Sequence, residues 1–330
     1  MILEKILVKV KTDKEIREEF LEAFSKRAEI VFCDNEISHN DLETATVILG
    51  EPTEEELSKC KNLKLLQLTW AGADKFLKMK NFPQNTTLAT ASGAFGEVIS
   101  EYVMGGILAL YRDFPTYFEN QKNHVWQKNG IVETISGKTV LILGAGDIGK
   151  TTAKKLKALG AKEVFGVRRN SKEDFVENFN EIFDIVELDT LLPKADIVIC
   201  CLPETEATIG VLNEELLSLM KENAVLVNVG RGSLIVTNDL IKILKQNKIK
   251  GAVFDVFENE PLPENSELWD MKNVIITPHI AGPSFSGDEE TTDKIWKICF
   301  ENIESYLCGG NLRNVVDFNK GYIVDFNKGY

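Results

Sequence analysis

The chain has 330 residues, and at about 150 residues per domain this length indicates two domains. Hydrophobic residues make up 44% and charged residues 27%, which is the balance of a globular protein rather than a disordered one. There are 38 lysines and arginines against 51 aspartates and glutamates, so the net charge of −13 has the wrong sign for a surface that binds nucleic acid.

The sequence lacks the features of membrane, secreted and zinc-binding chains. No run of eighteen apolar residues could span a bilayer, and the N-terminal segment has neither the basic region nor the cleavage site of a secretory signal. Six cysteines without a Cys-x-x-Cys pair form neither a disulfide framework nor a zinc site. We therefore expect a cytoplasmic protein without a membrane partner or a bound metal.

The first hundred residues alternate short β-type runs with amphipathic helical stretches. Helical spacing is clearest at Asp13–Arg27 and Glu54–Cys60. The predicted strands are Lys5–Val10, Glu29–Cys33, Thr46–Gly50, Leu63–Thr69 and Thr87–Ala91. This alternation predicts a parallel sheet with helices on both sides.

A second series of strands and helices begins at Lys138, after an apolar stretch from Gly96 to Asn123 that predicts one helix or a broken pair. The predicted strands are Thr139–Gly144, Glu163–Arg168, Asp184–Leu188, Asp196–Leu202, Ala224–Gly230, Gly251–Phe257 and Val274–Thr277. Such a series is typical of a dinucleotide-binding sheet. A last helix is predicted at Asp288–Leu307, and it is expected to return the chain to the first domain.

The C-terminal tail contains a tandem repeat. Val315–Tyr322 is copied at Ile323–Tyr330 with only the first residue changed. Two eight-residue units are too few and too short for a solenoid. The second copy is either an extension that adds little to the fold or a segment that packs on a partner subunit.

A glycine-rich loop joins the strand at Thr139–Gly144 to a predicted helix at Lys150–Leu159. It has the pattern G-x-G-x-x-G, in which the glycines allow a tight turn, the approach of a pyrophosphate and close helix–strand contact. The following helix offers its N-terminal N–H groups to the phosphates. The loop residues are Gly144, Ala145, Gly146, Asp147, Ile148 and Gly149.

The same residues also fit a phosphate-binding P-loop, because Gly149 is followed by Lys150 and Thr151. Asp255, at the end of a predicted strand, could imitate the acidic magnesium ligand of such a site. The tight G-x-G turn favours the dinucleotide interpretation, and a P-loop hydrolase is the alternative.

The residues after the next strand bear on the choice of cofactor. In dinucleotide sites an Asp or Glu about twenty residues past the loop binds the ribose 2′-hydroxyl. Here Arg168, nineteen residues after Gly149, takes that place and Arg169 follows it. Because a guanidinium binds a 2′-phosphate that a carboxylate would repel, NADP(H) is predicted over NAD(H). The alternative is that both arginines are solvated loop charges.

One of the three histidines, His279, follows a predicted strand at its carboxyl end, where open α/β sheets place their ligands. His39 and His124 lie in polar stretches and are interpreted as surface residues. Arg231 and Glu260 follow two other strands of the same series. Each alone could be structural, but three such groups at successive strand ends predict a site.

These segments resemble the D-isomer-specific 2-hydroxyacid dehydrogenases. Asn228–Ser233, Asp255–Pro263 and Thr277–Gly282 are similar to the three signature blocks of that family, and Trp70–Asp74 and Cys201–Thr208 match two further stretches. The resemblance covers nearly the whole chain. Within this family, Arg168 and Trp70 make the chain similar to the NADP-dependent glyoxylate/hydroxypyruvate reductase branch.

The resemblance implies reduction of a small 2-oxo acid to the D-2-hydroxy acid. Arg231 would bind the substrate carboxylate, His279 would be the acid–base, and Glu260 would orient the imidazole and favour its charged form. The other lobe would add Trp70 and the backbone N–H groups of Ala71 and Gly72. The implied cofactor-binding residues are Gly144, Gly146, Asp147, Ile148, Gly149, Arg168, Arg169, Leu202, Pro203, Thr208, Val229, Gly230, Asp255 and Gly282.

The resemblance also implies the fold and the partners. It predicts a doubly wound Rossmann-type parallel sheet at residues 102–284, and a discontinuous flavodoxin-like α/β substrate domain at 1–101 and 285–330. NADP(H) is the preferred cofactor, NAD(H) use stays open, and the expected assembly is a homodimer through the Gly96–Trp126 region.

Two other functions compete with this one. They are an NAD(P)H-sensing regulator on the same fold and an NAD-dependent dehydrogenase with another substrate. A non-catalytic relative should have lost Arg231, Glu260 or His279, and none is missing.

Overall fold

The computed structural model describes residues 4–34, 36–168, 175–285 and 288–324. The chain divides into two compact units, Met1–Ala94 with Ser284–Tyr330 and Phe95–Pro283. The first division precedes a continuous helix, α5 (Gly96–Tyr111), whereas the boundary placed at residue 101 from the sequence falls inside it.

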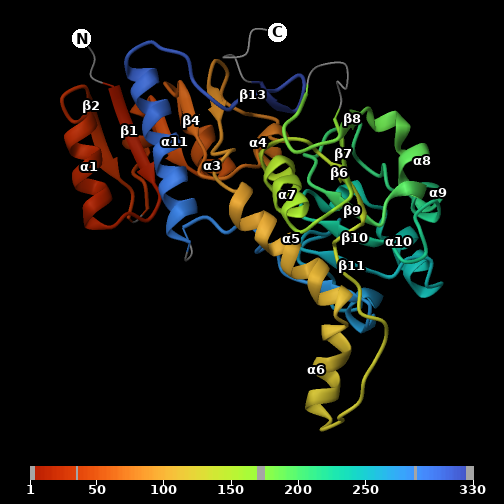
Figure 1. The fold of residues 1–330 in the computed structure, drawn as a ribbon. Helices are drawn as coiled ribbons and strands as arrows, with labels where there is room; N and C mark the ends of the chain where they lie inside the picture. Colours follow the sequence, from red (N-terminus) through yellow and green to blue (C-terminus); the bar gives the residue numbers. More distant parts are fainter. Residues whose placement is uncertain (1–3, 35, 169–174, 286–287, 325–330) are drawn as a thin grey trace. The chain divides into compact units, whose positions relative to one another are not determined.

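The first unit contains a seven-stranded sheet flanked by helices (Figure 1). Its strand order is β14-β13-β5-β4-β3-β1-β2, and the five N-terminal strands are parallel in the flavodoxin-like order β2-β1-β3-β4-β5. The strands are β1 (Glu4–Lys9), β2 (Ala28–Phe32), β3 (Val47–Gly50), β4 (Leu65–Gln67), β5 (Thr87–Ala89), β13 (Val315–Asp317) and β14 (Tyr322–Val324). The helices are α1 (Lys14–Phe24), α2 (His39–Thr44), α3 (Glu54–Ser58), α4 (Asp74–Leu77) and α11 (Glu289–Leu307).

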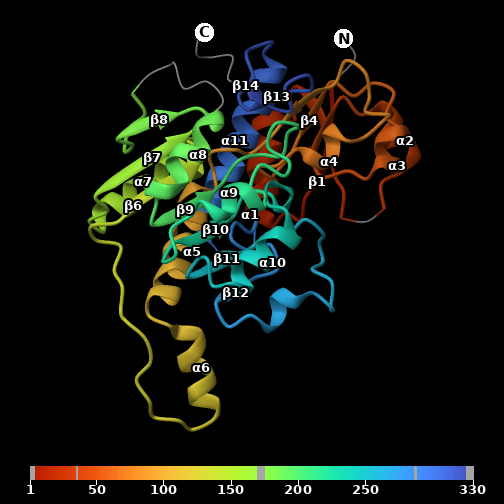
Figure 2. The same ribbon diagram turned by 90° about the vertical axis from the view of Figure 1, so that its right-hand side faces the viewer.

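The C-terminal segment completes this first unit. Helix α11 places Phe300 against Phe20 of α1, with ring centroids 4.6 Å apart. The first copy of the repeat forms β13, which pairs antiparallel with β5 through Val315 and Ala89. The second copy begins as β14 and pairs antiparallel with β13 (Figure 2). The repeat therefore extends the edge of the sheet, and residues 325–330 lie outside the described part.

The second unit is built on a parallel sheet of seven strands in the order β12-β11-β10-β9-β6-β7-β8. The strands are β6 (Thr139–Leu143), β7 (Glu163–Val167), β8 (Glu181–Phe183), β9 (Ile197–Cys200), β10 (Val225–Asn228), β11 (Gly251–Phe254) and β12 (Val274–Ile276). The helices besides α5 are α6 (Phe114–Lys122), α7 (Asp147–Ala158), α8 (Leu188–Leu191), α9 (Glu214–Ser218) and α10 (Thr237–Lys245).

The order of this sheet indicates where a ligand would bind. From β6 the chain moves outward to β7 and β8, and it then returns to the other side of β6 as β9. This is the Rossmann arrangement, in which ligands bind at the carboxyl ends of the strands where the order reverses. Every residue of β6, β9, β10 and β11 is buried, which accounts for their continuous apolar sequences.

The structure corrects one predicted strand and decides between the two alternatives for the segment after Gly96. The strand predicted at Asp184–Leu188 is wrong, because Asp184 and Glu187 form a reciprocal capping box around a 3₁₀ turn at Ile185–Glu187. The strand beside β7 is instead β8. The apolar stretch after Gly96 is a broken pair of helices, in which Asp113 takes a left-handed conformation between α5 and α6.

Among the described residues, none of the helices is long and apolar enough to cross a membrane.

Candidate active site

The glycine loop lies between β6 and α7, and its three glycines have different surroundings. Gly144 has φ +116°, and a Cβ added there would lie 2.9 Å from the carbonyl oxygen of Cys201. A Cβ on Gly149 would lie 1.9 Å from the carbonyl oxygen of Gly144. A Cβ on Gly146 would meet no described atom within 4 Å. The protein's own packing thus requires two glycines, while the third leaves the start of α7 accessible to a phosphate, as a dinucleotide needs.

Arg168 follows β7 directly beside this loop. The Gly144 N–H donates to the Val167 carbonyl at 2.9 Å, and the Arg168 N–H donates to the Phe183 carbonyl at 3.0 Å. The partly buried Arg168 is therefore held next to the glycine loop by both neighbouring strands. Arg169, the second predicted 2′-phosphate ligand, lies outside the described residues.

The loops after β9 and β10 contact each other. A Cβ on Gly230 would lie 2.8 Å from the Leu202 carbonyl oxygen, so only glycine allows the two loops to pass this closely. The Thr208 hydroxyl, 7% exposed, donates to the Pro203 carbonyl at 2.8 Å and accepts from the Thr205 N–H at 2.8 Å. Thr208 closes its own loop in this structure, and its predicted cofactor contact stays a prediction.

The turn that carries Arg231 is shaped by Asn228, which is 1% exposed. The Asn228 side chain accepts from the Gly230 N–H at 3.1 Å and donates to the Arg231 carbonyl at 3.0 Å. The Arg231 guanidinium donates from Nη1 to the Gly230 carbonyl at 2.8 Å. No role was predicted for Asn228, although an asparagine at a strand end is a typical turn former.

His279 and Glu260 are brought together across nineteen residues. The imidazole Nδ1 lies 2.8 Å from Glu260 Oε2, and Glu260 Oε1 accepts from the Phe257 N–H at 2.9 Å. The side chains are 54% and 37% exposed, respectively. With Nδ1 facing the carboxylate, Nε2 is the ring nitrogen that can meet a ligand.

Asp255 lies under the turn that carries His279. Its carboxylate accepts from the Thr277 hydroxyl at 2.6 Å and from the N–H groups of Ile280 and Ala281, both at 2.8 Å. His279 has φ +56°, a left-handed conformation that costs a non-glycine residue about 1 kcal/mol or more. The hydrogen bonds to Asp255 offset this cost, and the predicted cofactor contact of this carboxylate stays a prediction.

Gly282 closes the same turn by packing on α5. A Cβ on Gly282 would lie 2.8 Å from the side chain of Ile99, so the position has no room for a larger residue. Its predicted cofactor contact stays a prediction, as does that of Val229, which is 7% exposed after β10.

The predicted substrate loop Trp70–Gly72 belongs to the first unit and follows β4. Trp70 is 43% exposed, and its carbonyl accepts from the Ala91 N–H at 2.9 Å. The residue before the loop, Thr69, donates to Glu51 from its N–H at 2.8 Å and its hydroxyl at 2.9 Å. Burial raises the pKa of Glu51. This support from Glu51 was not predicted from the sequence, and the contact of the loop with substrate stays a prediction.

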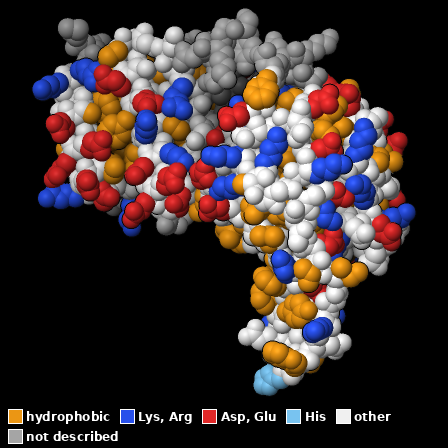
Figure 3. Space-filling model, in the orientation of Figure 1, with side chains coloured by type: hydrophobic (Ala, Val, Ile, Leu, Met, Phe, Trp, Pro, Cys, Tyr) orange, Lys and Arg blue, Asp and Glu red, His pale blue; other side chains and the backbone are white. Residues whose placement is uncertain are grey.

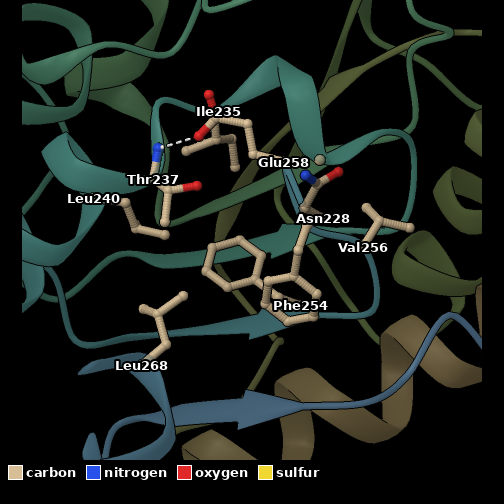
Figure 4. Close-up of a pocket in the computed structure, with 10 residues that line it drawn as sticks. Asn228, Ile235, Thr237, Leu240, Phe254, Val256, Glu258 and Leu268 are labelled. Carbon is tan, nitrogen blue, oxygen red and sulfur yellow. Dashed lines mark hydrogen bonds between the residues drawn. The ribbon is translucent and has the colours of Figure 1, made fainter. Parts of the chain in front are cut away.

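Two hollows in the second unit differ in size and lining. The one behind the Arg231 turn has a volume of about 10 Å³, room for about one water, and is crossed by a hydrogen bond from the Thr237 N–H to Glu258 (Figure 4). It is too small for a substrate. The other, of about 670 Å³, lies along α6 and is lined by residues from Tyr117 to Lys128.

Most of the chain matches known proteins of one family. The family model described as D-isomer specific 2-hydroxyacid dehydrogenase, NAD binding domain, matches residues 104–281. A glyoxylate reductase from Thermofilum pendens is 32% identical, over 77% of this chain and 75% of its own length.

Solved structures of the family resemble both units. A family protein from Aeromonas salmonicida is 32% identical, with a TM-score of 0.84 over 96% of this chain and 99% of its own. An NADPH-dependent glyoxylate/hydroxypyruvate reductase from Sinorhizobium meliloti, in complex with NADP and sulfate, is 28% identical, with a TM-score of 0.81 over 97% and 100%. The P-loop interpretation of Gly144–Thr151 is thereby rejected. The chain belongs to the D-isomer specific 2-hydroxyacid dehydrogenase family and is an NAD(P)-dependent oxidoreductase of 2-oxo and 2-hydroxy acids.

Proposed function

We propose that this enzyme reduces a small 2-oxo acid of the glyoxylate or hydroxypyruvate type to the D-2-hydroxy acid with NADPH. The observation that carries the proposal is the His279–Glu260 pair after β12 and β11, with Arg231 after the adjacent strand β10. The nicotinamide cofactor, when bound, supplies the hydride, and the protein supplies positioning, charge and a proton.

Each of the three residues has a separate task in this proposal. The Arg231 guanidinium binds the substrate carboxylate through two parallel N–H groups and thereby fixes the direction of the oxo group. His279 donates a proton from Nε2 to the oxo oxygen. Glu260 holds the tautomer and orientation of the imidazole through Nδ1.

Two observations support a small substrate: the position of Trp70 in the sequence and the names of matched proteins. A half-exposed indole beside the Ala71 and Gly72 N–H groups would limit the room for a substrate side chain. Glyoxylate reductase and glyoxylate/hydroxypyruvate reductase are the names of two of the matched proteins. A panel of glyoxylate, hydroxypyruvate, pyruvate and bulkier 2-oxo acids, each with NADPH and NADH, tests the proposal. Tight NADPH binding without oxidation by any of them would favour a sensor instead.

The preference for NADPH is assigned to Arg168, which is held beside the glycine loop. Arg168→Asp should lower kcat/KM for NADPH and raise that for NADH, because a carboxylate repels the 2′-phosphate and binds the 2′-hydroxyl. The ratio of the two values should move at least tenfold towards NADH. Lys248→Asp makes the same charge change on the exposed turn before β11 and is the matched control. An unchanged ratio in Arg168→Asp would remove this residue from the cofactor site.

A homodimer through the Gly96–Trp126 region is also proposed. Helix α6 projects from its own unit and carries hydrophobic side chains along its surface (Figures 1 and 3). Phe118 and Trp126 are 58% and 104% exposed, and large hydrophobic side chains exposed in this way typically mark a protein interface. Its occupant in the proposal is the same surface of a second copy.

Trp126→Asp should convert the dimer to a monomer, because a charge would be buried without a partner in the interface. Light scattering coupled to size-exclusion chromatography measures the mass directly. Trp269→Asp, at a half-exposed tryptophan elsewhere in the same unit, should leave the dimer intact. A wild-type chain that is monomeric at micromolar concentration would overturn the proposal.

A further inference from the structure

The turn that carries His279 is held by hydrogen bonds to Asp255. Asp255, 2% exposed, accepts hydrogen bonds from Thr277, His279, Ile280 and Ala281. Three of these bonds reach its carboxylate, and the His279 N–H reaches its backbone carbonyl at 2.8 Å. The position of the imidazole is therefore set by the position of Asp255 and of the groups that hold it.

A third residue, Tyr102 on α5, joins this arrangement. Its hydroxyl lies 2.6 Å from the Thr277 hydroxyl, which lies 2.6 Å from Asp255 Oδ1. Thr277 has a single hydroxyl proton, and an ionised carboxylate can only accept. That proton must point at Asp255, so Tyr102 must donate to Thr277. The reverse direction would bring two oxygen lone pairs together at 2.6 Å.

Tyr102 is suited to a permanent donor role. Burial raises the pKa of its phenol to about 12, so the hydroxyl keeps its proton throughout the neutral range. The helix that carries it packs against the same turn at a second point, where Ile99 meets Gly282. Helix α5 thus contacts the turn through a polar group and through an apolar one.

We propose that Tyr102 is a positioning residue for the proton donor His279, acting through the chain Tyr102–Thr277–Asp255. Its hydroxyl fixes the Thr277 rotamer that binds Asp255, and Asp255 holds the left-handed turn at His279. The effect on the reaction rests on the proposed function, whereas the effect on the turn does not.

The variant Tyr102→Phe removes the phenol oxygen and little else. We expect kcat for 2-oxo acid reduction to fall about tenfold, with the KM values for substrate and NADPH changing less than threefold, because Arg231 and the glycine loop lie on other strands. Tyr111→Phe is the matched control. Tyr111 is buried on the same helix, and its hydroxyl has no hydrogen-bond partner among the described residues. Its removal should leave kcat unchanged.

A double-mutant cycle tests whether Tyr102 acts through Thr277. Thr277→Val should lower kcat as Tyr102→Phe does, and Thr277→Ser, which keeps the hydroxyl, should recover most of that loss. Tyr102→Phe should then cost nothing further in the Thr277→Val background, since coupled residues are not additive. Fully additive losses, or equal losses in Tyr102→Phe and Tyr111→Phe, would overturn the proposal.

Hydrogen exchange provides a readout that needs no turnover. Peptides covering residues 277–283 should exchange faster in Tyr102→Phe than in the wild-type chain or in Tyr111→Phe, because the Ile280 and Ala281 N–H groups depend on Asp255. Unchanged exchange would overturn the proposal even in an active enzyme. If the wild-type chain reduces no 2-oxo acid, the proposed function fails while this measurement still decides the role of Tyr102.

Discussion

His279→Ala is expected to lower kcat for 2-oxo acid reduction by about 10³-fold, the typical contribution of a positioned general acid. The substituted chain has no group at this place that can protonate the oxo oxygen. NADPH affinity should change less than threefold, because the glycine loop and Arg168 lie at β6 and β7, on the other side of β9. Steady-state rates and a fluorescence titration with NADPH measure the two quantities separately.

The control for this prediction is another histidine. His39 is exposed at the start of α2 in the first unit, and His39→Ala should leave both quantities at wild-type values. Turnover within a few fold of wild type in His279→Ala would reject this residue as the proton donor. A large loss in both histidine variants would point to a general loss of structure.

Arg231→Gln is expected to lower kcat/KM for a 2-oxo acid by about 10²- to 10³-fold, because two charge-assisted hydrogen bonds to the carboxylate are lost. Arg231→Lys keeps the charge without the planar fork, so its loss should be intermediate. The Asn228 bonds to the Gly230 N–H and the Arg231 carbonyl involve backbone atoms, so the turn should survive both substitutions.

A neutral substrate separates carboxylate binding from other roles of Arg231. Methyl pyruvate has an ester in place of the carboxylate, so its slow reduction should be nearly the same in the wild-type enzyme and in Arg231→Gln. Equal losses for pyruvate and methyl pyruvate would show that Arg231 does not bind the carboxylate. A glutamine variant as active as the wild type on pyruvate would exclude it from the site.

Much of the fold follows from local patterns. The apolar run Thr139–Gly144, the glycine loop and the following helix were predictable because strand, turn and helix each have their own signal within a few residues. The segment at Asp184–Leu188 was not, because its apolar residues suggest a strand while Asp184 and Glu187 cap a turn. The capping hydrogen bonds, rather than the hydrophobic pattern, determine that this segment is a 3₁₀ turn.

The candidate site was predictable where its residues follow strands. Arg231, Glu260 and His279 stand out because the carboxyl ends of parallel strands meet at one edge of a sheet. The groups that hold them in place were not predictable. Tyr102 and Thr277 are 175 residues apart, and only the packing of α5 on the sheet brings their hydroxyls together. Glu51 and Thr69 likewise meet only through the neighbouring strands β3 and β4.

A crystal structure of the enzyme with NADPH and oxamate, a 2-oxo acid analogue that is not reduced, would test the joint action of Arg231, Glu260 and His279 most directly. We expect two hydrogen bonds from the Arg231 guanidinium to the oxamate carboxylate, and His279 Nε2 about 3 Å from the oxamate carbonyl oxygen. Glu260 should stay on Nδ1. Oxamate bound away from Arg231, or an imidazole turned away from the oxamate, would rule out the proposed roles of these residues.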